Sequence, residues 1–211
     1  MPLLPNDPVS VVHLIDDDEP VRQSLAFLLA STGHAVRVYD SAAAFLLIAA
    51  GVRTGCVISD LRMPDIDGLE LQRRLKELGS DLPVIFITGH GDVTAAVQAM
   101  KAGALDFIEK PFEDDVILDA VRLAFEQNHQ PGARNAEAAQ VAARLAALSP
   151  REREVLDGLV AGMPNKTIAY DLKLSPRTVE VHRANLMIKM EARSLSSLVR
   201  MALVANILTT G

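Results

Sequence analysis

The sequence contains one cysteine and no long apolar run. Cys56 has no second thiol in the chain to pair with, which is typical of proteins in a reducing compartment. A membrane-spanning helix needs about 18 or more consecutive apolar residues, and no such stretch is present. Residues 1–7 do not place an apolar segment after a basic one, so we expect no signal peptide. These absences predict a cytoplasmic protein without membrane contact.

Charge is unevenly distributed along the chain. Residues 1–143 contain 11 Lys and Arg against 21 Asp and Glu, a net charge of −10. Residues 144–211 contain 10 against 6, a net charge of +4. This asymmetry predicts an acidic regulatory part followed by a mildly basic part that is suited to nucleic acid.

The first part of the chain alternates apolar strand patterns with amphipathic helix patterns. Five strands are expected near residues 10–15, 35–39, 55–59, 83–88 and 106–109. Helices are expected between them and from about residue 113, with N-caps at Ser41 and Asp92. Strands that alternate with helices favour the α/β class, here a doubly wound five-stranded parallel sheet. We assign residues 1–127 to this domain.

The last part of the chain has only helical patterns and short turns. Residues 128–148 are expected to form a partly helical linker, and residues 149–211 a small all-α domain. Ser149 and Glu152 have the spacing of a capping box, with Pro150 at the first helical position. A short helix near 166–172, a turn at 173–175 and a helix to about 191 have helix-turn-helix spacing. Residues 195–208 form a last helix, which packs either as a dimer seam or as ordinary core.

Acidic and basic side chains follow the predicted strands of the first domain. Asp60 ends one apolar run, and Asp16 and Asp17 end another. Thr88 and Lys110 stand at the ends of two further runs, and Lys110 precedes Pro111 at an expected turn or cis bond. Ligands of open parallel sheets bind beyond these strand ends. Carboxylates suit Mg²⁺, and the set is typical of phosphoryl transfer to Asp60.

Residues 8–127 resemble the receiver domain of two-component response regulators. The resemblance implies that Asp60 is phosphorylated and that Thr88, Phe107 and Lys110 form the catalytic and switch set. It further implies that Mg²⁺ is held by Asp16, Asp17, Asp60 and the backbone carbonyl of Arg62. The neighbouring acids have simpler explanations. Asp18 and Glu19 suit the first turn of a helix, and Asp65 and Asp67 suit a turn.

Residues 144–209 resemble the output domain of the LuxR/NarL class, through 148-LSPREREVL-156, Asn165-Lys166 and Thr178-Val179 with His182. Val179, Leu186 and Met190 share one helical stripe and are expected to pack on Ile168 and Leu172. The exposed side is expected to carry Glu180, Arg183, Ala184 and Met187. Candidate DNA contacts are Asn165, Lys166, Arg177, Thr178, Glu180, Val181, His182, Arg183, Ala184 and Lys189.

Together these resemblances imply a transcription regulator rather than an enzyme. Its partners would be a sensor histidine kinase, double-stranded promoter DNA and RNA polymerase, and it would form a homodimer on phosphorylation. The segments 88-TGHGDV-93 and 104-ALDFIEKPF-112 are similar to the FixJ subgroup. That similarity implies activation of nitrogen-fixation or low-oxygen respiratory genes, with a haem-containing kinase. The alternatives are a FixJ-like regulator that answers another signal and a phosphorylation-switched protein-interaction adaptor.

Overall fold

The computed structural model describes residues 11–89, 93–127 and 134–209. The described parts of residues 1–90 and 102–130 form one compact unit, and those of 91–101 and 131–211 form a second. No helix in the described ranges has both the length and the apolar character needed to cross a membrane. The expected N-cap Asp92 lies outside the described residues.

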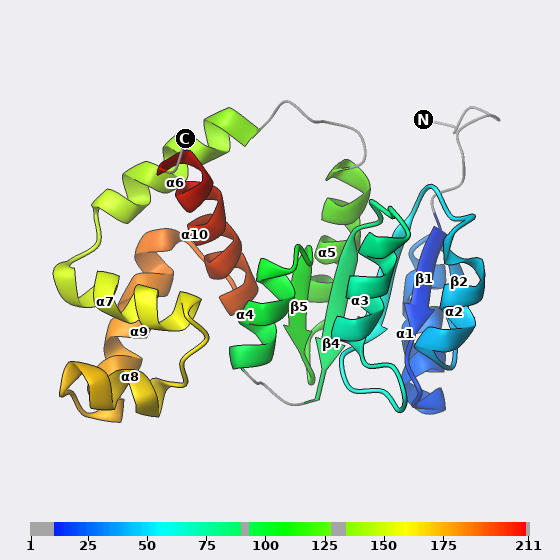
Figure 1. Cartoon of the computed structure of the whole chain (residues 1–211), viewed down its shortest axis with the longest axis horizontal. Coiled ribbons are helices and arrows are strands. Elements are labelled where there is room, and N and C mark those ends of the chain that lie inside the picture. Colours follow the sequence, from blue (N-terminus) through cyan, green and yellow to red (C-terminus); the bar gives the residue numbers. More distant parts are fainter. Residues whose placement is uncertain (1–10, 90–92, 128–133, 210–211) are drawn as a thin grey trace. The chain divides into compact units, whose positions relative to one another are not determined.

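The first unit is a parallel sheet between helices (Figure 1). Its five strands lie in the order β2-β1-β3-β4-β5, and every neighbouring pair is parallel. The expected α/β fold with a doubly wound sheet is confirmed. The elements along the chain are β1 Val11–Ile15, α1 Glu19–Ser31, β2 Ala35–Tyr39, α2 Ala42–Ala49, β3 Cys56–Asp60, α3 Gly68–Glu77, β4 Val84–Thr88, β5 Asp106–Glu109 and α5 Asp114–Gln127.

Alternating residues of the central strands build two apolar layers. On one face, side chains such as Leu14 and Ile58 pack against Leu25 of α1 and Ile117 of α5. On the other face, His13 lies against the ring of Phe45 from α2, with 5.1 Å between ring centroids. Because β1, β3 and β4 are buried on both faces, they are mostly apolar and lack the regular alternation of apolar and polar residues seen in strands with one exposed face.

The start of β3 contains the only cysteine. Cys56 is fully buried, and this burial raises the pKa of its thiol to about 12. Gly55 precedes it with φ 117°, and a Cβ at this position would lie 2.2 Å from the carbonyl oxygen of Val11. The strand therefore enters the sheet through a backbone approach that only glycine permits. Cys56 is a core residue, as an apolar strand environment predicts.

The second unit is helical. It contains α4 Val93–Lys101, α6 Arg134–Ala146, α7 Pro150–Val160, α8 Asn165–Leu172, α9 Pro176–Met190 and α10 Leu195–Thr209. Leu159 of α7, Ile168 of α8, Leu186 of α9 and Leu198 of α10 are buried in one apolar cluster. On α10, Leu198 and Ala202 belong to this core, so ordinary packing accounts for them without a dimer seam. The side chain of Leu208 lies outside the described residues.

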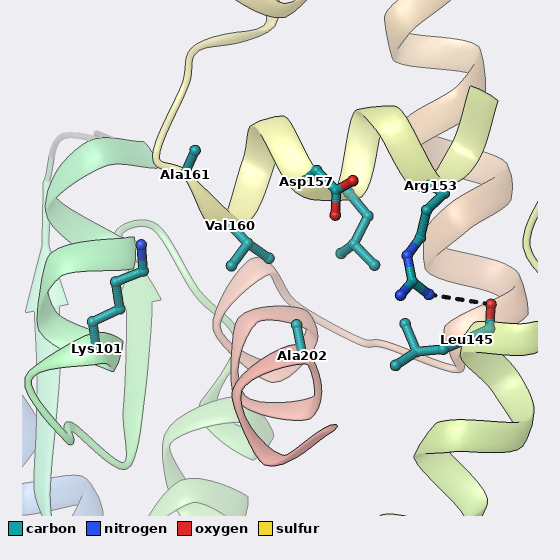
Figure 2. Close-up of a pocket in the computed structure, with 8 residues that line it drawn as sticks. Lys101, Leu145, Arg153, Asp157, Val160, Ala161 and Ala202 are labelled. Atoms are coloured by element: carbon teal, nitrogen blue, oxygen red, sulfur yellow. Dashed lines mark hydrogen bonds between the residues drawn. The ribbon is translucent and has the colours of Figure 1, made fainter. Parts of the chain in front are cut away.

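Helix α6 packs as part of this helical unit. Its Val141 is 2% exposed and belongs to the same apolar cluster. Arg153 of α7 donates a hydrogen bond from Nη1 to the carbonyl oxygen of Leu145, at 3.5 Å (Figure 2). Arg144 of α6 contacts the end of α9 through the carbonyl oxygen of Met190, at 3.3 Å. Within the segment 128–148, the described helix is therefore tied to the core of the unit.

Candidate functional site

Two carboxylates are held at the C-terminal edge of the sheet. Asp16 follows β1 directly and is 1% exposed, and its Oδ1 accepts the backbone N–H of Asp18 at 2.9 Å. Asp60 is the last residue of β3 and is 8% exposed, and its Oδ2 accepts the backbone N–H of Arg62 at 2.6 Å. Since β1 and β3 are adjacent parallel strands, their ends place both acids at the same edge.

Lys110 joins these two carboxylates. Its Nζ lies 3.0 Å from Oδ2 of Asp16 and 3.0 Å from Oδ1 of Asp60. The peptide bond from Lys110 to Pro111 is cis, one of the two geometries expected at this position. The backbone N–H of Lys110 also bonds the carbonyl oxygen of Thr88 at 2.7 Å, which fixes the chain beyond β5 to the end of β4.

The loop after Asp60 is tightly packed against β3. Gly68 begins α3, and a Cβ there would lie 2.8 Å from the carbonyl oxygen of Asp60 and 2.7 Å from the ring of Phe86. Asp67 is the N-cap of α3, since its carboxylate accepts the N–H of Glu70 at 2.8 Å. Asp65 has φ 62°, a left-handed turn conformation. Both acids therefore shape the turn, as expected.

The charges of the site are not balanced. Burial raises the pKa of Asp60, and the bonds from Lys110 and Arg62 only partly oppose this effect. For Lys110, burial acts to lower the pKa, but the bonds to Asp16 and Asp60 outweigh it and the pKa is raised. Two carboxylates thus share one ammonium group.

The donor chemistry around Asp60 fits Mg²⁺ in part. Asp16 and Asp60 supply hard carboxylate oxygens close together at the edge of the sheet, and such oxygens suit this ion. Asp17, the other expected ligand, is exposed. Among the described residues, no three His, Cys, Asp or Glu side chains are gathered so that they could hold a metal ion. The full ligand set of Asp16, Asp17, Asp60 and the Arg62 carbonyl therefore stays a prediction.

The expected switch residues lie on the neighbouring strands. Thr88 is 1% exposed at the end of β4, directly beside Glu109 in the register of β5. Phe107 is 8% exposed within β5, opposite Phe86. Both are therefore core side chains in this conformation.

The second candidate site is the helix-turn-helix of α8 and α9. Lys173 ends α8 in a left-handed conformation with φ 55°. Ser175 then caps α9, because its Oγ accepts the N–H of Thr178 at 3.0 Å. Pro176 occupies the first turn. At the start of α7, Ser149 and Glu152 form the complete capping box that their spacing predicts.

Burial divides α9 into two sides. Val179, Leu186 and Met190 are fully buried in one cluster with Ile168 and the half-buried Leu172, as the stripe pattern predicts. Of the residues expected on the exposed side, Arg183 and Met187 are instead half-buried. Met187 is half-buried against this cluster, because it neighbours Leu186 and lies one turn from Met190.

The other expected DNA contacts differ in exposure. Lys166, Arg177, Glu180, Val181 and Ala184 are exposed, whereas Asn165, Thr178, His182 and Arg183 are half-buried. The Nζ of Lys189 lies 2.7 Å from Oε2 of the buried Glu152. Lys189 is thus held by an internal ion pair, and its side chain is 41% exposed.

Beyond Pro176 in its first turn, α9 has two exposed residues that were not in the expected set. Ile188 is 74% exposed, and Asn185 is also exposed. Asn185 lies four positions after Val181 and Ile188 lies seven positions after it, and Val181 is itself 50% exposed. Residues at these spacings share one face of a helix, so this pattern was available in the sequence.

Comparison with known proteins assigns both parts of the chain to described families. Residues 12–122 match the family described as response regulator receiver domain, and residues 146–202 match bacterial regulatory proteins of the luxR family. The transcriptional regulatory protein FixJ of Rhizobium meliloti is 59% identical over 192 residues, covering 91% of this chain and 94% of that protein. The response regulator protein TmoT of Ectopseudomonas mendocina is 43% identical over 195 residues, covering 92% and 89%.

A solved structure gives the same result. The crystal structure of full-length FixJ from B. japonicum covers 94% of this chain and 98% of its own, with 51% identity and a TM-score of 0.56. The family combines a receiver domain with a LuxR-type helix-turn-helix and is non-enzymatic. The chain therefore belongs to the two-component response regulators, as a FixJ-like transcription regulator with a LuxR-type DNA-binding domain.

Proposed function

We propose that this protein is a cytoplasmic transcription activator that is switched by phosphorylation of Asp60. The observation that carries the proposal is the bridge of Lys110 between Asp16 and Asp60, on a chain that also contains a helix-turn-helix. A reactive carboxylate at the end of a parallel strand, with an ammonium group at 3.0 Å, is arranged for phosphoryl transfer.

In the proposed reaction, a carboxylate oxygen of Asp60 attacks the phosphorus of a phosphohistidine on a sensor kinase. The new O–P bond forms as the P–N bond breaks, and the imidazole leaves with the electron pair and takes up a proton. Lys110 then turns from the Asp60 carboxylate to the phosphoryl oxygens, and the hydroxyl of Thr88 donates a hydrogen bond to them. Asp16, Asp17, Asp60 and the Arg62 carbonyl are assigned to Mg²⁺, which when bound neutralises charge on those oxygens.

The phosphorylated form is proposed to dimerise and bind promoter DNA. Inward movement of Thr88 and rotation of Phe107 would shift the first domain between two states. Two linked copies of α9 would then enter successive major grooves of a two-fold related site. RNA polymerase is proposed as the next partner, because an activator acts through the transcription machinery.

The proposed targets are nitrogen-fixation or low-oxygen respiratory genes. Similarity to FixJ proteins over nearly the whole chain supports this assignment. The runner-up is the same mechanism in response to another signal. It is supported by the relatives named TmoT and TodT, which match over a similar share of the chain.

The switch is tested with the full chain and its Asp60→Asn variant. Binding to a candidate promoter is measured by fluorescence anisotropy, with and without acetyl phosphate and Mg²⁺, and the oligomeric state by light scattering. The expected result is tighter binding and dimerisation that require both the donor and Asp60. If both proteins bind the promoter equally under all conditions, DNA recognition is constitutive and the role of Asp60 is refuted.

A further inference from the structure

The exposed face of α9 carries little free positive charge. Arg177 lies 3.7 Å from the carboxylate of Glu180, and Lys189 is paired with Glu152 at 2.7 Å. Arg183 is half-buried, and its Nη1 donates to the Oδ1 of Asn165 at 3.4 Å. Arg183 and Lys189 are therefore engaged within the protein, whereas Arg177 is 87% exposed in the first turn of the helix and lies outside its middle.

The remaining exposed residues form one uncharged stripe. Val181, Asn185 and Ile188 follow each other at spacings of four and three, and Ala184 lies beside them. Among the residues that the structure describes, the Asn185 amide has no hydrogen-bond or ion-pair partner. From Val181 to Ile188 the helix rises by about 10 Å, which is comparable to the width of about 12 Å of the DNA major groove.

The position of this stripe is fixed by contacts on the opposite side of the helix. Leu186 and Met190 are fully buried. At the C-terminal end, Arg144 of α6 donates to the carbonyl oxygen of Met190 at 3.3 Å and pairs with Glu191 at 2.5 Å. Because both core packing and polar contacts hold α9, the uncharged stripe is presented in one orientation before DNA arrives.

We infer that Asn185 is a specificity-determining residue that reads an adenine, and that Val181 and Ile188 contact the methyl groups of neighbouring thymines. An asparagine amide pairs with N6 and N7 of adenine through two hydrogen bonds, and apolar side chains favour the thymine methyl group. Arginine and lysine, the usual readers of guanine, are absent from the middle of this stripe. The preferred half-site therefore contains an adenine flanked by A·T pairs.

The inference rests on the proposed DNA-binding function, and the experiment separates the two. Full-length wild type, with acetyl phosphate and Mg²⁺, is used to select double-stranded DNA from a randomised pool. The relative affinity for each base at each position is then measured. Wild type is expected to prefer adenine at one position by about 5- to 150-fold over other bases.

Three variants test whether the preference for adenine comes from Asn185. Asn185→Ala is expected to lose the adenine preference at that one position and to keep the preferences elsewhere, and Asn185→Arg to shift it toward guanine. The control is Arg151→Ala, an exposed position on α7 away from the stripe, which is expected to leave every preference unchanged. Because Asn185 is exposed and alanine favours helices, the variant is expected to fold.

The apolar contacts are tested by removing methyl groups from the DNA. Deoxyuridine in place of thymidine beside the adenine is expected to weaken binding of wild type, but not of Val181→Ala combined with Ile188→Ala. If Asn185→Ala weakens binding equally at all sequences, or changes nothing, the assignment of Asn185 is overturned. If phosphorylated wild type shows no sequence preference at all, the proposed function itself fails.

Discussion

The buried Glu152 offers a quantitative test of what holds the DNA-binding unit together. Its carboxylate accepts the backbone N–H of Ser149 at 2.7 Å and the ammonium group of Lys189 at 2.7 Å, so it joins the start of α7 to the end of α9. Glu152→Ala removes both bonds. A capping interaction contributes about 1 kcal/mol, and a hydrogen bond to a charged group about 1.5–3 kcal/mol.

We expect Glu152→Ala to lower the free energy of unfolding by about 2–3 kcal/mol. The cost stays below that of breaking a fully buried pair, because Lys189 is 41% exposed and recovers hydration. Hydrogen exchange of the amides in α7 and α9 measures the change in this unit alone. Glu152→Gln is expected to lose less, since its amide oxygen still accepts from Ser149.

The same residue predicts a dependence on pH. The bond from Lys189, followed by that from Ser149, lowers the pKa of Glu152 from 4.5 to about 2. A group with a lowered pKa stabilises the folded state above its unfolded pKa. This contribution is therefore complete above about pH 4.5 and is lost as the pH falls toward 2, and Glu152→Ala should lack it.

The matched control is Glu154→Ala. Glu154 pairs with Arg151 at 2.8 Å, but both side chains are solvent-exposed, so the expected loss is below about 0.5 kcal/mol. Equal losses in the Glu152→Ala and Glu154→Ala variants would refute the reasoning that burial makes the first pair important.

Three further perturbations test other parts of the molecule. Burial, aided by Arg37, lowers the pKa of His13, so the first unit should lose stability as the pH falls below 6.5, by up to about 1.4 kcal/mol per pH unit. Urea unfolding at pH 7 and 5.5 should show this loss in wild type but not in His13→Gln. Gly68→Ala should lower the free energy of unfolding by about 1–3 kcal/mol and slow phosphorylation of Asp60. Gly51→Ala, whose added Cβ would make only ordinary contacts, should have neither effect. Arg144→Met should lower the free energy of amide hydrogen exchange in the last turn of α9 by about 1 kcal/mol. Equal exchange in the variant and wild type would show that Arg144 does not stabilise the end of α9.

The sheet was predictable because its strands are short apolar runs bounded by turn residues. Each expected strand lies within one residue of its observed bounds, for example β3 at Cys56–Asp60. The meeting of Asp16, Asp60 and Lys110 also followed from the rule that parallel strands end at one edge. The sequence does not show that one ammonium group bridges both carboxylates. The position of the Lys110 side chain depends on the path of the chain at Pro111.

Helix α9 was harder to predict in detail. Its buried stripe of Val179, Leu186 and Met190 is apolar and regular, so the sequence indicates it clearly. Its exposed side also carries large apolar side chains, Val181 and Ile188, which weakens the amphipathic contrast that normally separates core from surface. The pairing of Lys189 with Glu152 joins residues that are 37 positions apart, and no local pattern predicts such a contact.

The buried thiol at the start of β3 provides a natural label for following this protein in solution. Cys56 is the only cysteine and is fully buried, and its pKa of about 12 keeps it protonated and unreactive while the sheet is closed. A thiol-specific reagent therefore reacts only as fast as β3 becomes exposed. Labelling kinetics in the unmodified protein thus report openings of the five-stranded sheet separately from those of the helical unit. If the proposed phosphorylation occurs, addition of a phosphodonor would show directly whether it tightens or loosens that sheet.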